Sequence, residues 1–166
     1  MKIRTIAAAA TCLAAAALTV PLPANAGSIP ECTNADLTAS YQGGDAAMSH
    51  VYGRIVLTNT GDRACVTGGY GGLSYVGGGD GTQVGAAADR DAGRVRLYVL
   101  KPGDRVRSRV AETSYAPFPK AKCRPRHVDG FRVFIPDATA SQFIAHPTTG
   151  CANGEVHLIS HRPYRR

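Results

Sequence analysis

The sequence contains no tryptophan, and this absence excludes the Cys–Trp–Cys core that is typical of antibody domains. It has no Cys-x-x-Cys pair and no compact cysteine–histidine spacing, so we expect no metal site. The Gly-Lys dipeptide of a Walker phosphate-binding loop is missing as well. We also find no N-glycosylation acceptor, no internal repeat and no long Pro/Ser linker. These absences favour one domain that works without a cofactor.

The first 26 residues have the form of an export signal. Lys2 and Arg4 provide a positive start, an alanine-rich apolar stretch covers residues 6–20, and an Ala-x-Ala site ends at Ala26. The apolar stretch is too short for a comfortable membrane span, so we expect no transmembrane segment after cleavage. Cleavage leaves 166 − 26 = 140 residues and lowers the net charge from +7 to +5, because two basic residues are lost. We predict a secreted, extracellular protein with a moderately basic surface.

Cysteine usage agrees with export. The sequence has five cysteines, and Cys12 lies inside the apolar part of the signal, away from any lipid-attachment cut. The four that remain predict two disulfides, for which three pairings are possible. A turn near residue 46 between the first two predicted strands would bring Cys32 toward Cys65. This arrangement favours the pairs Cys32–Cys65 and Cys123–Cys151.

Residues 67–85 carry nine glycines, which raises the question of a phosphate-binding loop. A dinucleotide fingerprint would need glycine at the positions that Ser74 and Thr82 occupy, and no helix start follows the stretch. The glycines instead flank the short strand-like run "LSYV". We therefore interpret them as turn residues that supply positive φ angles.

Short β-rich runs separated by turn residues recur along residues 27–166. The expected strands cover residues 36–42, 50–59, 72–76, 82–88, 93–100, 104–113, 130–136 and 155–161. Residues 139–146 fit a further strand or a single helical turn, and nothing else looks helical. The pattern predicts a single all-β domain over residues 27–166, an immunoglobulin-like antiparallel β-sandwich with two disulfides. Its end, "HRPYRR", is interpreted as a short, disordered basic C-terminal tail.

Two arrangements of residues invite a catalytic interpretation. Ser74 lies in a stretch close to Gly-x-Ser-x-Gly, but Val76 stands where the second glycine belongs and no α/β pattern surrounds it. Cys151 with His146 or His157 would suggest a thiol enzyme, but the predicted disulfide removes that nucleophile. We expect neither, and therefore no enzyme.

The histidines give no metal site either. His157 and His161 would share a face of a strand, but at ~3.3 Å per residue they would lie about 13 Å apart, too far for one ion. His50 and His127 have no visible partners in the sequence.

The best positive feature is an arginine-rich pair of strands around Pro102-Gly103. In the register expected for a hairpin, Val95, Leu97 and Val99 point the same way as the apolar face of residues 106–110. The arginines then share the opposite face, and the candidate polyanion-binding residues are Arg94, Arg96, Arg105, Arg107 and Arg109. The alternative is a solvated basic surface moderated by nearby aspartates.

Several stretches together resemble a known family. They are "CTNADLTAS", "HVYGRIVLTNTG", "CVTGGYGGLSYV", "LKPGDRV", "CRP" and "GFRVFIPD", followed by the late Cys151. The sequence is similar in these places to an actinobacterial exported family known only as a domain of unknown function, family 4232. The resemblance implies a secreted or lipid-anchored all-β domain of the cell envelope and no activity, so it carries over no functional residues. The lipid-attachment cysteine common in that family is missing here.

Two functions of different kinds remain. The first is a non-enzymatic binding module of the cell envelope that contacts acidic polymers through the arginine face. The alternative is a secreted inhibitor or partner of another exported protein that binds through the glycine-rich loops; a hydrolase comes third. We expect a monomer.

Overall fold

The computed structural model describes residues 27–166, so the signal peptide predicted over residues 1–26 lies outside the described residues. The described chain is built of strands and one single-turn helix. In chain order these are β1 (Leu37–Ala47), β2 (His50–Asn59), β3 (Cys65–Gly68), β4 (Gly72–Gly77), β5 (Thr82–Ala87), β6 (Asp89–Arg90), β7 (Leu97–Leu100), β8 (Arg105–Thr113), α1 (Lys120–Cys123), β9 (Pro125–Phe134), β10 (Ser141–Cys151) and β11 (Ile159–His161). No helix within residues 27–166 has the length and apolar character that a membrane crossing needs.

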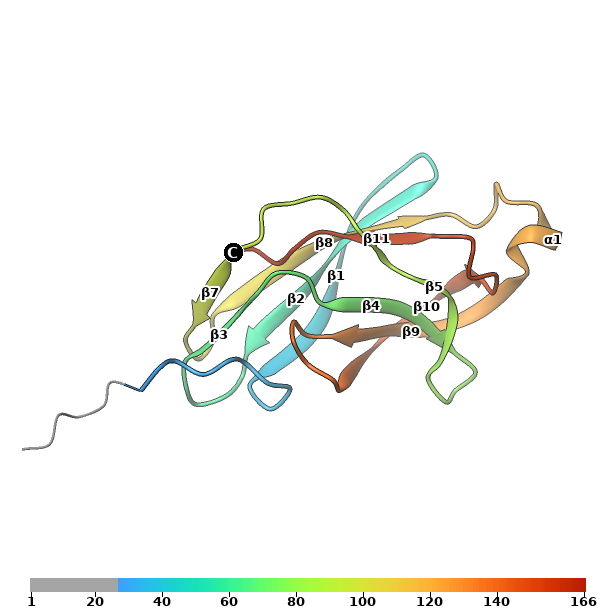
Figure 1. The fold of residues 1–166 in the computed structure, drawn as a ribbon. Helices are drawn as coiled ribbons and strands as arrows, with labels where there is room; N and C mark the ends of the chain where they lie inside the picture. The colour runs from blue at the N-terminus through green and yellow to red at the C-terminus, as the bar shows by residue number, and fades with distance from the viewer. Residues whose placement is uncertain (1–26) are drawn as a thin grey trace, which may run out of the picture.

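The strands form two main sheets and one small one (Figure 1). A five-stranded sheet has the order β1-β2-β8-β11-β6, a four-stranded sheet has the order β10-β9-β4-β5, and β3 pairs with β7. All pairs are antiparallel except β11 with β6. The all-β fold class predicted from the sequence is confirmed.

The core lies between the two main sheets, because alternate residues of each strand point inward. The five-stranded sheet contributes aliphatic side chains from β2 and β8, and the four-stranded sheet contributes Phe131 and Val133 from β9. Each such side chain stabilises the fold by about 1.5–3 kcal/mol when fully buried. The inward residues of β2 and β8 are Ile55, Leu57, Val106 and Val110.

Several predicted elements have different bounds in the structure. Of residues 139–146, residues 141–146 belong to a strand, β10, and not to a helical turn, and the strand expected at 155–161 is reduced to β11. The strands β3 and β6 and the helix α1 were not expected. Each spans four residues or fewer, which is too short for a periodic pattern to be visible.

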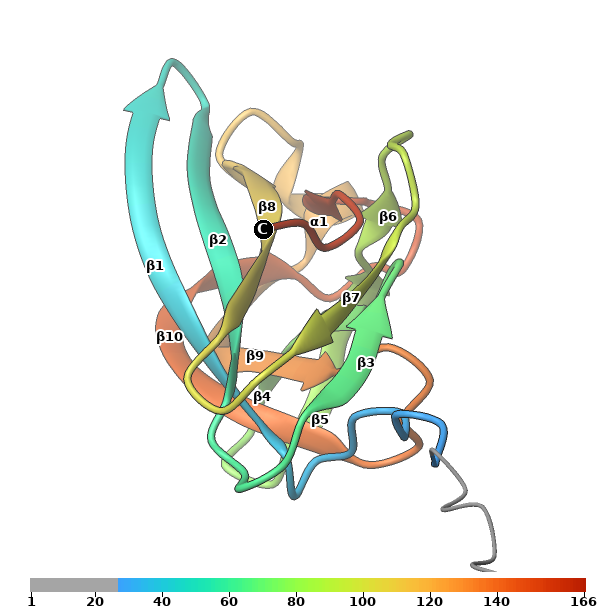
Figure 2. The ribbon, with the colours of Figure 1, turned by 90° about the vertical axis from the view of Figure 1, so that its left-hand side faces the viewer.

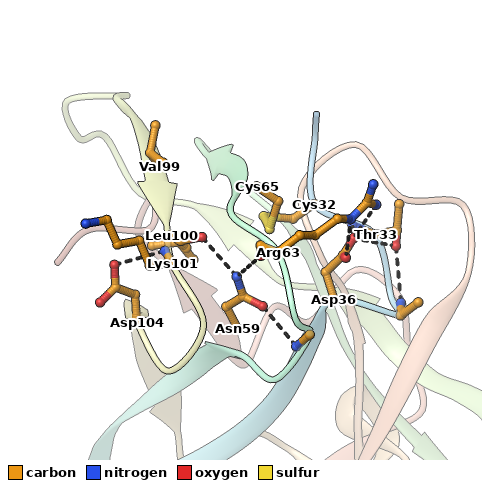
Figure 3. Close-up of a disulfide and its surroundings, with 12 residues drawn as sticks. Cys32, Thr33, Asp36, Asn59, Arg63, Cys65, Val99, Leu100, Lys101 and Asp104 are labelled. Atoms are coloured by element: carbon orange, nitrogen blue, oxygen red, sulfur yellow. Dashed lines mark hydrogen bonds and ion pairs between the residues drawn. A yellow bond between two sulfur atoms is a disulfide. The ribbon is translucent and has the colours of Figure 1, made fainter. Parts of the chain in front are cut away.

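The prediction of a hairpin between residues 93–100 and 104–113 is wrong. The turn itself is present, with Asp104 N–H donating to Lys101 O at 2.9 Å, but β7 pairs with β3 while β8 pairs with β2 and β11. Asn59 contacts both sides of the turn. Its backbone N–H donates to Asp104 O, and its side chain donates to Leu100 O (Figure 3). The two strands therefore diverge into different sheets.

The C-terminal segment pairs with the edge of β8 that residues 93–100 would occupy in the predicted hairpin. Arg107 and Arg165 exchange two backbone hydrogen bonds, of 2.7 and 3.0 Å, and Tyr164 N–H donates to Gly69 O. Tyr164 is only 2% exposed. The prediction of a disordered tail is thus wrong, because an aromatic side chain among the charges gives the segment an apolar contact with the core.

The predicted disulfide pairing is present. Cys32–Cys65 joins the N-terminal segment to β3, and Cys123–Cys151 joins α1 to the end of β10. Next to the first bridge, Asp36 accepts hydrogen bonds from Thr33 and Arg63 (Figure 3). The Arg63 hydrogen bond, followed by those from Thr33, lowers the pKa of Asp36 to about 2.

We predict that Tyr164→Ala lowers the free energy of unfolding by about 3–5 kcal/mol, because it leaves a cavity where a large side chain was buried. Arg162→Ala, an exposed change in the same segment, is the control and is expected to alter stability by less than about 0.5 kcal/mol. Chemical denaturation of both variants measures the difference. Equal, small effects would show that the segment does not pack on the core.

Candidate functional site

The arginines of β8 lie on the outer face of the five-stranded sheet. Val106, Ser108 and Val110 are buried, and the residues between them point outward. Of the outward set, Arg105 and Arg109 are exposed and Arg107 is half-buried. For β8, the orientation of alternate residues agrees with the prediction.

For residues 95–99 the orientation is the reverse of the prediction. Val95, Leu97 and Val99 are exposed, whereas Leu100 is buried opposite Cys65. Arg94 and Arg96 therefore do not lie across a hairpin from the arginines of β8.

The C-terminal segment adds arginines that the sequence analysis left out of the site. Because Arg107 and Arg165 are directly opposed on neighbouring antiparallel strands, their side chains leave the same face of the sheet. Arg162 is held by a hydrogen bond of 3.0 Å from its backbone N–H to Arg109 O. The signal that could have identified this segment as a strand was Tyr164, an aromatic residue between charges.

Residues 91–96 approach the C-terminal segment from the other side. Asp91 is anchored by its N–H, which donates to His161 O at 2.9 Å, and by its carboxylate, which accepts from Ser160 Oγ at 3.0 Å. Gly93 then passes so close to Pro163 that a Cβ at this position would lie 2.6 Å from the proline ring. Only glycine allows this approach without a shift of the backbone.

These segments together enclose a depression of about 330 Å³. Its walls are Gly93, Arg94, Arg96, Tyr98, Arg162, Pro163 and Arg165. No acidic residue lines it, and four of its seven lining residues are arginines. We call Arg94, Arg96, Arg162 and Arg165 the arginine cluster.

No arginine of the arginine cluster forms an ion pair with a carboxylate of residues 27–166. Salt bridges from arginine occur there at Arg63 with Asp36 and at Arg166 with Asp104, both outside the cluster. Guanidinium groups gathered without a partner repel one another, and an anion relieves that repulsion. The fork geometry of arginine suits phosphate and carboxylate oxygens.

Arg109 belongs to a neighbouring and smaller depression of about 240 Å³. Its guanidinium carbon lies 4.7 Å from the centre of the Tyr52 ring, and Arg54 is its register partner on β2. Asp45 lines the same depression. The structure thus divides the five predicted residues: Arg94 and Arg96 lie in the arginine cluster, Arg105, Arg107 and Arg109 lie on β8.

A second polar cluster is buried between the two main sheets. The carboxylate of Glu112, 6% exposed, accepts hydrogen bonds from Tyr41 Oη at 2.8 Å and from Tyr75 Oη at 2.6 Å. His146 Nε2 lies 2.9 Å from the same carboxylate, and its ring stacks on Phe131. Glu112 and Tyr41 come from one sheet, Tyr75 and His146 from the other.

The negative charge of Glu112 is stabilised by its hydrogen-bond partners. Burial raises the pKa of Glu112, but the hydrogen bonds from His146, Tyr75 and Tyr41 outweigh it, so the pKa is below its usual value. Burial and the adjacent carboxylate raise the pKa of Tyr75 far above its ordinary value. The cluster lies beside a depression of about 320 Å³ that Glu112 and His146 help to line.

The other candidate residues from the sequence have structural roles in a strand, a disulfide and a turn. Ser74 is buried on β4, and Cys151 is in its disulfide, so it carries no free thiol. The glycines of residues 77–81 form the turn of the β4–β5 hairpin, with positive φ at Gly78, Gly79 and Gly81. No group of three or more potential metal ligands occurs within residues 27–166.

The histidines have partners that the sequence did not reveal. His50 Nδ1 lies 3.2 Å from Thr113 Oγ1, His127 lies 3.4 Å from Asp129, and His157 lies 2.8 Å from Asp89. His161 is buried next to Ser108, and burial, followed by the charge of Arg90, lowers its pKa to about 4.

The chain matches the model of a known family. The model of a family described as a domain of unknown function, DUF4232, matches residues 32–163, a stretch that includes every cysteine of the described chain. This is the family that the motifs of the sequence resemble. None of the curated proteins and none of the solved structures matches the chain significantly.

The buried histidine predicts a pH dependence of stability. His161 binds a proton in the unfolded chain below its ordinary pKa of 6.5, but in the folded protein only below about 4. Between these values the unfolded state holds more protons, so stability falls as the pH falls, by up to about 3 kcal/mol. Denaturation at pH 7, 5.5 and 4 should show a flatter profile for His161→Gln, and parallel profiles would contradict this assignment.

The buried carboxylate predicts a second effect. Tyr75→Phe removes one donor to Glu112 without changing the ring, and it should lower the free energy of unfolding by about 1–3 kcal/mol. Tyr115→Phe is the matched control, because Tyr115 is exposed. Thermal and chemical unfolding of both variants compare them, and equal stability would mean that the bond from Tyr75 contributes little.

Proposed function

The chain belongs to the DUF4232 family, and we propose that it is a binding module that contacts acidic polymers through the arginine cluster. The observation that carries this proposal is the convergence of Arg94, Arg96, Arg162 and Arg165 on one depression without a carboxylate. Two segments far apart in the sequence supply these arginines. A basic surface that is only solvated would not need such a convergence. The proposed mode is binding without catalysis.

The acidic polymer we propose is one of the cell envelope. The signal peptide predicted over residues 1–26 would export the protein, and both disulfides suit an oxidising compartment outside the cytosol. Two arginines on each side of the depression can contact successive phosphate or carboxylate groups of an extended chain. Buried Ser74 and the disulfide at Cys151 support a binding role, because the two nucleophiles considered above are not accessible.

The test is retention of residues 27–166 on a heparin matrix as a function of salt. The triple variant Arg94→Ser, Arg96→Ser, Arg162→Ser should elute at lower salt and reduce the slope of log affinity against log salt by about two to three, one for each lost contact. The matched control is Lys120→Ser, Lys122→Ser, Arg126→Ser. It removes the same charge from exposed positions at the α1 end of the molecule, away from β7 (Figure 1).

Comparing the two triple variants distinguishes binding at a specific site from an effect of net charge alone. A larger loss in the arginine-cluster triple supports the proposal, whereas equal losses would mean that only total charge matters. Salt-independent binding of another exported protein, unchanged in both triples, would favour the alternative of a protein partner.

A further inference from the structure

The depression beside Glu112 lies where one main sheet extends past the other. In both Figure 1 and Figure 2 the turn between β1 and β2 lies above β9 and β10, and residues at this turn form one wall of the depression, whose volume is about 320 Å³. Val51 points to the same side of β2 as the buried Ile55 and Leu57, yet it is 43% exposed. The inner face of the five-stranded sheet is therefore open to solvent at this point.

A carboxylate lies at the floor of this depression. Glu112 of β8 is the register partner of Val51, and the Tyr41 side chain crosses β2 so that its hydroxyl donates to Glu112. Gly53 of β2 makes this crossing possible, because a Cβ there would collide with the Tyr41 hydroxyl. Glycine weakens the interior of a strand, and here it gives the buried carboxylate a donor in return.

The carboxylate keeps room for one more donor. An ionised carboxylate has about four acceptor positions on its two oxygens. Within residues 27–166, Oε2 of Glu112 accepts from Tyr75 and lies 2.9 Å from His146 Nε2, whereas Oε1 accepts from Tyr41 alone. One acceptor position on Oε1 is left for a donor from outside the chain.

The charge of its walls distinguishes this depression from its neighbours. Four other depressions of residues 27–166 have arginine in their walls: those of the arginine cluster and of Arg109, one of about 450 Å³ with Arg124 and Arg126, and one of about 370 Å³ with Arg90. The depression beside Glu112 is lined by no arginine and no lysine. A cation can therefore reach the Glu112 carboxylate there without a guanidinium group that repels it.

Apolar and aromatic side chains surround the carboxylate. Met48, Val51 and Tyr115 line the depression, and all three are exposed. Their gathering at one place differs from the single apolar residues that are scattered over most protein surfaces. The face of an aromatic ring attracts a cation, and the aliphatic side chains favour contact with an apolar group.

We propose that this depression binds a small organic cation, an ammonium group attached to an apolar body. The ammonium group donates a charge-assisted hydrogen bond to Oε1 of Glu112, and the apolar body covers Met48, Val51 and Tyr115. The volume lies within the range of small-molecule sites, about 300–1,000 Å³. None of the lining residues belongs to the arginine cluster, so this site is independent of the proposed function.

The experiment is an NMR titration of isotope-labelled residues 27–166 with benzylamine at pH 8. Benzylamine carries an ammonium group at this pH, benzyl alcohol has nearly the same shape without the charge, and benzoate carries the opposite charge. We expect benzylamine to shift the amide signals around Glu112 saturably, with a Kd of about 1 mM, because so few atoms limit its affinity. Benzyl alcohol should bind at least about tenfold more weakly, because it lacks the charge-assisted contribution, and benzoate should not bind.

Two substitutions test the role of the carboxylate. Glu112→Gln keeps the shape and removes the charge, and Val51→Lys places an ammonium group of the chain itself opposite Glu112. Each should weaken the binding of benzylamine at least about tenfold. Because Val51 is exposed, the second variant tests the site even where the first loses stability. Leu97→Lys, which adds the same charge at a 70% exposed position outside the depression, is the matched control and should bind benzylamine like the unaltered protein.

The outcomes decide the proposal. Selective binding of benzylamine that is lost in Val51→Lys and kept in Leu97→Lys supports it. Equal affinity for benzylamine and benzyl alcohol would show an apolar site without cation recognition and would overturn it. Unchanged binding in Val51→Lys, signal shifts confined to other parts of the chain, or no saturable shift at millimolar concentrations would overturn it as well.

Discussion

The pairing of Arg165 with Arg107 fixes the arrangement of the chain around the arginine cluster. Two backbone hydrogen bonds hold the C-terminal segment along β8 and bring Tyr164 over the core. That edge of β8 is thus occupied, and β7 pairs with β3, which leaves Val95, Leu97 and Val99 exposed. The same pairing carries Arg162 and Arg165 to Arg94 and Arg96. The arginine cluster therefore depends on this pairing.

The two main sheets are joined by a polar contact as well as by the apolar core. Glu112 is a buried carboxylate, and its hydrogen bonds cross from one sheet to the other through Tyr75 and His146. A buried charge without donors would cost several kcal/mol, so the register of both sheets must keep these donors in place. The contact therefore favours one alignment of the sheets over others that bury the same apolar area.

Local patterns in the sequence predicted what depends on neighbours along the chain. The alternation of Val106, Ser108 and Val110 predicted the faces of β8, and it also placed Glu112 on the inward face, a signal of a buried carboxylate that went unused. The turn at Lys101–Asp104 was predicted as well. The pairing partners of the strands were not predicted. Apolar and polar residues alternate along residues 94–100, and this alternation is compatible both with a hairpin to β8 and with pairing to β3. The C-terminal segment, which contains Tyr164, occupies the edge of β8 that the hairpin would have used, and it lies more than fifty residues away in the sequence.

The position of the C-terminal segment also bears on the rate of folding. Arg107 and Arg165 pair across a separation of 165 − 107 = 58 residues, whereas the turn at Lys101–Asp104 joins residues that are neighbours in the sequence. Contacts between neighbours in sequence form faster than distant ones, so pairings of this kind make folding slower than it would be in a chain built of local hairpins.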